Sequence, residues 1–276
     1  MLTDNKLLVD INCPLCKIYT KGFIKMNLLD ESCVYPYQFI SDQECKSIDM
    51  NKAKTEIALH DSSSGETRYG LASLLHILTH NNVHLNSLAN HKLLTAPLSI
   101  LYKFITYNRK VVYPYRSGVN PLRTCLPSLH VGYRWAFIIF VALFTAVVVN
   151  EFTSHLFSAL GWMHNYYTEL LVCFGQVAWQ GTVAFAIVKD KALDYLGNMS
   201  TVSFIGALIL MPFLLLANIY AFSTLVLLIY FAMVIGIMFL EHNRRCKTLG
   251  ITTWMTFSWV AFRFTALGLI LLSKGL

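Results

Sequence analysis

The sequence predicts an α/β domain followed by an all-α bundle of about five membrane-spanning helices. Hydrophobic residues make up 55% of the 276-residue chain and charged residues only 13%, against roughly 45–50% and about 25% in average soluble domains. The long apolar runs lie after Gly132, whereas the earlier residues alternate short strand-like and helix-like segments. We therefore divide the chain into a domain at 1–115, a basic linker at 116–132 and a transmembrane bundle at 133–276.

The first domain is expected to follow the order β-α-β-(α)-β-β-α, which is thioredoxin-like in outline. The expected elements are a strand at Leu7–Val9, a helix from Pro14 to about Leu28, a strand at Cys33–Ile40, a hairpin of Glu56–His60 and Thr67–Tyr69, and helices at Leu71–Thr79 and Leu93–Tyr107. Pro36 indicates that the second strand is an edge strand or is bulged, because proline cannot donate to a ladder. The basic, turn-rich stretch NRKVVYPYRSGVNPLRT then predicts the connection to the bundle.

Five apolar runs have the length of a membrane span, since a hydrocarbon core of about 30 Å needs roughly 20 helical residues. They are Tyr133–Val149, Thr168–Val188, Thr201–Ile219, Ala221–Leu240 and Thr252–Leu272. The third and fourth are separated by so few residues that a tight hairpin is expected. Pro212 is expected to kink the third span, and neighbouring helices must then satisfy the freed carbonyl group.

Lysine and arginine alternate between the two ends of these spans. One end carries Arg109, Lys110, Arg116, Arg123, Lys189, Lys191, Arg244, Arg245 and Lys247, whereas the loop Asn150–Tyr167 has no positive residue. Positive flanks face the cytoplasm, and the start of the chain, MLTDNKLLVDIN, has no signal-peptide core. We therefore expect a multi-pass integral membrane protein with a cytoplasmic N-terminal domain. The net charge of +7 then reflects contact with the lipid bilayer and not with nucleic acid.

A pair of cysteines, Cys13 and Cys16, stands where the first strand ends and the first helix begins. Unpaired N–H groups at a helix start favour a thiolate, and Pro14 suits the first helical turn. In a dithiol, Cys13 would attack a substrate disulfide and Cys16 would resolve the mixed disulfide. Asp10 could accept a proton from Cys16, or it could cap the helix.

Other readings of the cysteines and histidines remain open at this point. The two cysteines could be unreactive, or they could bind zinc together with Cys33 and Cys45. Seven cysteines without a framework pattern argue against a disulfide-stapled secreted domain. The histidines at His76, His80 and His84 could bind a metal or form a polar helix face.

The pattern Asp10-x-x-Cys13-x-x-Cys16 near the N-terminus resembles the DCC family of predicted thiol-disulfide oxidoreductases. The stretches YGLASLLHIL and LYKFITYNRK are similar to later parts of that family, so the resemblance covers about residues 5–115. The family usually has Gly-Asp before the first cysteine, where this chain has Ile11-Asn12, so no role of that acidic residue carries over. The resemblance implies a thioredoxin-like fold and disulfide exchange, and it does not reach the membrane half.

Two functions follow as expectations. The first is a membrane-anchored thiol-disulfide oxidoreductase that acts on a protein or small-molecule disulfide and needs no cofactor beyond its own redox-active disulfide. The second is a membrane transport or sensor protein whose CxxC domain is a redox switch or a zinc clip. Arg263, near the middle of the fifth span, marks either a helix-pinning contact or a site. Its expected partners are Glu169, Gln176 and Gln180.

Overall fold

The computed structural model describes residues 2–10, 13–40, 48–80, 91–114, 129–162, 164–217 and 219–273. It divides into two compact units, Met1–Tyr133 and Arg134–Leu276. Most of the linker expected at 116–132 lies outside the described residues. Each unit is therefore described by itself.

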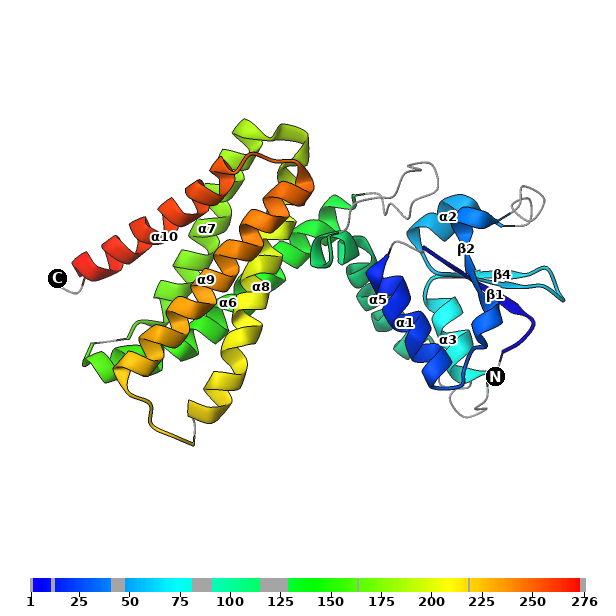
Figure 1. The fold of residues 1–276 in the computed structure, drawn as a ribbon, viewed down its shortest axis with the longest axis horizontal. Helices are drawn as coiled ribbons and strands as arrows, with labels where there is room; N and C mark the ends of the chain where they lie inside the picture. The colour runs from blue at the N-terminus through cyan, green and yellow to red at the C-terminus, as the bar shows by residue number, and fades with distance from the viewer. Residues whose placement is uncertain are drawn as a thin grey trace. The chain divides into compact units, whose positions relative to one another are not determined.

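A four-stranded sheet forms the centre of the first unit (Figure 1). Its strands are β1 (Asn5–Val9), β2 (Val34–Pro36), β3 (Ala58–Asp61) and β4 (Thr67–Tyr69). Their order is β2-β1-β3-β4, with β1 parallel to β2 and antiparallel to β3, and β3 and β4 form the expected hairpin. Strand β2 lies at an edge, as Pro36 predicts, but it has three residues where eight were expected. Short 3₁₀ turns at Glu31–Cys33 and Tyr37–Phe39 replace its two ends.

Helices cover both faces of this sheet (Figure 1). Alternate residues of β1 point to opposite faces, so Leu7 and Val9 pack with α1 (Pro14–Lys25) and α3 (Leu71–Thr79). Leu8 instead packs in a second cluster that includes Ala53 of α2 (Met50–Thr55). Helix α1 thus starts directly after a strand that is buried on both faces.

The next helix, α5 (Lys92–Val112), is longer than the sequence predicts. We expected it to end at Tyr107, because the basic stretch that follows is typical of a linker. Instead Asn108 and Arg109 are helical and buried, and the Asn108 side chain donates to the carbonyl groups of Phe104 and Tyr133 at 2.9 and 3.0 Å. These tertiary contacts stabilise polar residues inside the domain, which composition alone does not reveal.

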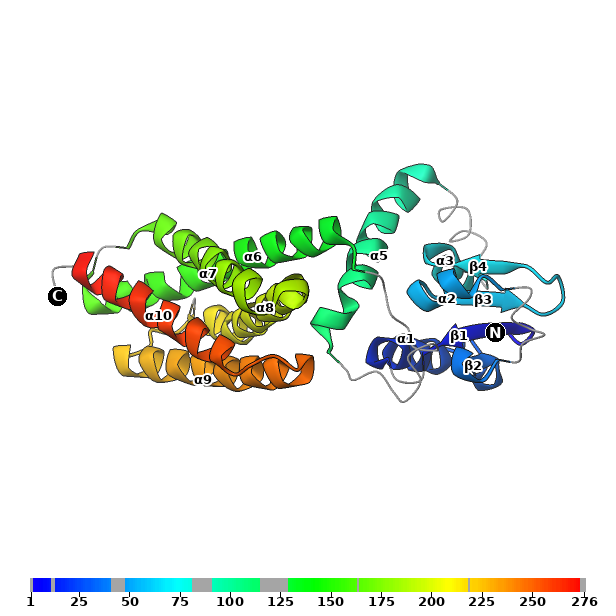
Figure 2. The same cartoon turned by 90° about the horizontal axis from the view of Figure 1, so that it is seen from above.

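The second unit contains five helices that are long and apolar enough to cross a membrane (Figure 2). They are α6 (Val131–Leu160), α7 (Tyr166–Ile187), α8 (Ala192–Ala217), which follows a 3₁₀ turn at Lys189–Lys191, α9 (Thr224–Leu249) and α10 (Trp254–Ser273). The chain is therefore a multi-pass membrane protein with the predicted number of spans among its described residues. Large apolar side chains remain exposed on these helices, such as Phe264 at 69% and Leu240 at 67%, as a lipid-facing surface requires.

Three spans extend well past their expected bounds. Helix α6 continues to Leu160, and α8 begins at Ala192 instead of Thr201. Helix α9 continues to Leu249, so the basic residues expected in a loop lie on its last turns. A helix with polar ends resembles a loop by composition. Here Glu241 pairs with Arg244 and Arg245, three and four residues further on, which supports helix over the polar end.

Close packing joins α8 and α9. A Cβ atom at Gly206 of α8 would collide with the sulfur of Met238 on α9, so only glycine fits there without a shift. Trp259 and Phe152 are among the largest fully buried side chains of the bundle core.

Candidate dithiol site

The dithiol occupies the first turn of α1. Cys13 is the N-cap residue, with extended backbone angles and no capping hydrogen bond from its side chain, and Pro14 follows at the first helical position. The Cys13 N–H donates to the Asp10 carbonyl at 3.1 Å, which fixes the turn from strand to helix. Both cysteines are free thiols, and they are buried, at 1% and 3% exposure. The sequence therefore placed this pair correctly on its elements.

Polar groups near the Cys13 sulfur favour its thiolate. The side chain and backbone N–H of Cys16, the charge of Arg109 and the N–H of Leu15 together lower the pKa of Cys13 from 9.0 to about 6, although burial acts in the opposite direction. A thiol with a pKa of about 6 is roughly nine-tenths ionised at pH 7, whereas one with a pKa of 9.0 is only about 1% ionised. A lowered pKa suits Cys13 for nucleophilic attack.

Arg109 is the functional candidate that the sequence reasoning missed. It lies near the C-terminal end of α5, it is 9% exposed, and its positive charge is one cause of the lowered pKa of Cys13. The available signal was the Asn-Arg pair in LYKFITYNRK, but its adjacency to a basic stretch made it resemble a linker. Only the packing of α5 shows that Arg109 belongs to the folded domain. Tyr102, on the same helix, accepts a hydrogen bond from the Ile57 N–H at 3.1 Å.

Asp10 lies beside the dithiol and is almost fully buried, at 1% exposure. The Gln38 side-chain amide donates to its carboxylate at 2.5 Å. Asp10 therefore stands at the end of β1 as expected, with Gln38 as a partner that the sequence did not indicate. Its possible role as a proton acceptor for Cys16 stays a prediction.

A four-cysteine zinc site does not fit the sheet register. Val34 pairs with Leu7, so Cys33 lies near the start of β1, where its thiol donates to the carbonyl groups of Leu2 and Thr3. Cys13 follows the opposite end of the same strand. Cys45 lies outside the described residues.

The histidine hypothesis is only partly covered by the structure. The rings of His76 and His80 lie 5.7 Å apart on one face, while His84 lies outside the described residues. Within the described ranges, no three of the His, Cys, Asp and Glu side chains come together as a metal site.

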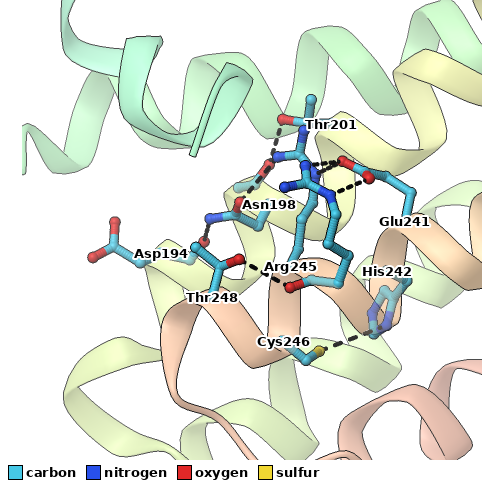
Figure 3. A network of polar contacts seen from close by, with 10 residues as sticks. Asp194, Asn198, Thr201, Glu241, His242, Arg245, Cys246 and Thr248 are labelled. Carbon is cyan, nitrogen blue, oxygen red and sulfur yellow. Dashed lines mark hydrogen bonds and ion pairs between the residues drawn. The ribbon is translucent and has the colours of Figure 1, made fainter. Parts of the chain in front are cut away.

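In the bundle, Arg263 is brought together with two of its three expected partners. Its charge interacts with Glu169, and it lines a small cavity with Gln176. Gln180 points elsewhere, since its amide oxygen accepts from the Tyr195 hydroxyl at 2.8 Å. A second group of polar contacts lies where α8 begins and α9 ends (Figure 3).

Comparisons of the chain with protein-family models, curated proteins and solved structures find no match.

The pH dependence of Cys13 alkylation tests this electrostatic environment. We expect the alkylation rate, followed for each cysteine by mass spectrometry on the full chain, to rise with pH with a midpoint near the pKa of about 6. Cys16→Ala should raise that midpoint most, because it removes the largest stabilising contact, and Arg109→Leu should raise it less. Arg109→Lys keeps the charge and serves as the control. A midpoint that none of these substitutions moves would contradict the assignment.

Proposed function

We propose that the chain is a membrane-anchored thiol-disulfide oxidoreductase whose catalytic dithiol is Cys13 and Cys16. The observation that carries the proposal is the pair of free thiols in the first turn of α1, where the pKa of Cys13 is lowered to about 6. The test is to measure disulfide reduction by the purified full chain. We expect this activity to be lost when Cys13 is replaced.

The arrangement of the first unit supports a thioredoxin-like domain of the DCC type at 1–115. The β2-β1-β3-β4 order, with one parallel pair and two antiparallel pairs, is compatible with such a sheet. The dithiol begins the helix that follows the central strand β1, as disulfide exchange on such a fold requires.

The reaction balances as two successive exchanges. The Cys13 thiolate attacks one sulfur of a substrate disulfide, which forms a mixed disulfide and releases the other substrate sulfur as a thiolate that takes up a proton. Cys16, after losing its proton, attacks the Cys13 sulfur and releases the reduced substrate. The protein is left with a Cys13–Cys16 disulfide, which a reducing dithiol must return to two thiols.

Because the dithiol is buried, a substrate disulfide must first gain access to the Cys13 sulfur. Cys13 is 1% exposed, so a substrate disulfide reaches it only through a local opening around the start of α1. This burial also protects the low-pKa thiolate from peroxide and other small oxidants, to which such groups are susceptible.

Charge at the helix ends supports a cytoplasmic position for the dithiol. Where α6 begins, where α7 joins α8 and where α9 ends, the described helices carry Arg134, Lys189, Lys191, Arg244, Arg245 and Lys247. The connections at 161–165 and 218–223, at the other ends of the helices, contain neither lysine nor arginine. Because positive flanks are retained in the cytoplasm, this pattern favours a cytoplasmic N-terminal unit, where disulfides are reduced.

Labelling of introduced cysteines tests that orientation. Tyr166 begins α7 and is 72% exposed, so Tyr166→Cys should react with a membrane-impermeant maleimide in intact cells. Thr253→Cys, just before α10, should react only after lysis. The unsubstituted chain supplies the background from its own cysteines. Labelling of Thr253→Cys alone in intact cells would reverse the topology.

A further inference from the structure

A buried carboxylate lies near the end of the bundle where α6 joins α7. Glu169 is 7% exposed, and the Thr153 hydroxyl lies near enough to interact with its carboxylate. Thr153 also contacts the ring nitrogen Nε2 of His164, in the α6–α7 connection, at 3.4 Å. Polar groups thus lead from this connection into the bundle.

A positive charge on α10 lies near Glu169. Arg263 interacts electrostatically with Glu169 and with the Cys173 thiol, and its guanidinium lies 5.4 Å from the centre of the Trp259 ring. An unpaired charge inside an apolar bundle is costly. Glu169 therefore has two acceptable states: ionised beside Arg263, or neutral with a bound proton.

The middle of the bundle contains a small polar cavity. Its polar lining comes from four helices, through Thr145, Gln176, Ser200, Ser203 and Arg263. Gln176 is 2% exposed and Thr145 is 4% exposed. Both polar atoms of the Gln176 amide, the Thr145 hydroxyl and Nε of Arg263 are buried and make no hydrogen bond within the described part of the chain.

These buried groups point to water in the cavity. The cavity leaves about 10 Å³ for the centre of a water-sized molecule, which is roughly what one water needs. Buried polar groups without a protein partner are generally satisfied by water or an ion. One water bonded to two or more of these side chains would remove their desolvation cost.

A separate hydrogen-bonded chain begins at Gln180 and leads toward the end where α9 meets α10. Gln180, one helical turn beyond Gln176, accepts from Tyr195, whose hydroxyl lies 3.1 Å from Nε2 of His242. The other ring nitrogen of His242 lies 3.0 Å from the Thr256 hydroxyl and 3.7 Å from the Cys246 sulfur. His242 and Cys246 lie one turn apart near the end of α9 (Figure 3).

We propose that the helical bundle conducts protons across the membrane along this polar path. Glu169 takes up the proton, water in the central cavity connects the two halves of the path, and the Tyr195–His242 pair carries the proton toward the far end. Hydroxyl groups, imidazole and water can each accept one hydrogen bond and donate another, as transfer along a chain requires. The path uses neither Cys13 nor Cys16, so this proposal can be tested independently of disulfide exchange.

Each transfer conserves the number of protons and carries one positive charge across the membrane. A proton bound from water at one membrane face is released to water at the other, and a counter-ion must move by a separate route. The groups that face Glu169 are Arg263 from α10, Thr153 from α6 and Cys173 from its own helix.

The test is proton flux into sealed vesicles that contain the purified full chain, a pH-sensitive dye and a potassium gradient, with valinomycin to move the counter-ion. We expect flux at least ten-fold above that of empty vesicles. Glu169→Gln removes the proton-binding group and Gln176→Met removes the cavity amide at similar volume, so each should lower the flux at least ten-fold. Thr182→Val is the matched control on α7, because Thr182 is exposed and bonds only back to the Ala178 carbonyl among described contacts.

Two results would overturn the proposal. One is flux from the unsubstituted chain no higher than that of empty vesicles. The other is a flux that Glu169→Gln and Gln176→Met leave unchanged, or that follows an imposed chloride gradient in place of the pH gradient. Gel filtration and thermal unfolding of each variant in detergent confirm that it is folded, and Ser203→Ala replaces any variant that is not.

Discussion

Replacing Cys13 by serine is expected to lower disulfide reduction by the full chain at least about 100-fold. A serine hydroxyl is not ionised near neutral pH and forms no disulfide, so neither half of the exchange can proceed. Cys16→Ser should retain the first attack and lose the second, so that it accumulates a mixed disulfide on Cys13. The measurements are the rate of insulin reduction with a dithiol donor, and non-reducing gels that resolve the trapped substrate.

Cys33→Ser is the matched control for this loss, because Cys33 is equally buried in the same unit and lies at the other end of β1. It should leave the reduction rate within about two-fold of the unsubstituted chain. Equal activity of the Cys13→Ser and Cys33→Ser chains would remove the catalytic assignment.

Replacing Glu241 by leucine is expected to destabilise the bundle by about 3–5 kcal/mol, the cost typical of leaving a buried charge without its partner. The Arg245 side chain is 4% exposed, and its Nε donates to Glu241 at 2.7 Å. Its Nη1 donates to Asn198 at 2.9 Å, which ties α9 to α8 (Figure 3). Without the carboxylate, Arg245 keeps the amide contact and loses a counter-charge. Thermal or denaturant unfolding in detergent measures the change.

Two further variants separate this charge effect from a general effect of substitution. Glu241→Leu combined with Arg245→Met removes both charges and should recover most of the lost stability. Glu151→Leu removes an exposed carboxylate that faces His155 at 3.9 Å, and it should cost less than about 1 kcal/mol. A double variant that is as unstable as Glu241→Leu alone would show that the charge pair is not the cause.

Local sequence signals predicted those parts of the fold that depend on neighbours in the chain. Helix α1 begins at Pro14, directly after Cys13, because a proline at the first helical position and an apolar repeat both act within a few residues. The hairpin of β3 and β4 followed from a turn-rich segment, and β2 lies at the edge as Pro36 indicates. The five apolar helices followed from length and composition.

Errors occurred where a polar residue is stabilised by a partner far away in the sequence. We predicted that the linker begins at Asn108 and Arg109, because the sequence does not show that they are buried. Their burial depends on how α5 packs in the first unit. The polar end of α9 was predicted to be a loop for a different reason: its composition is that of a loop, although the pairs that Glu241 makes with Arg244 and Arg245 are local. Of the partners expected for Arg263, Gln180 proved to face Tyr195, which a list of residues on one helix cannot reveal.

The sequence by itself determined the dithiol, the helix that begins at it, and the number of apolar helices behind it. Only the tertiary structure placed the charge of Arg109 near Cys13 and joined Tyr195 to His242, 47 residues apart. The physical reason is that periodicity fixes which residues share a helix face, whereas the rotation and packing of each helix decide what that face meets.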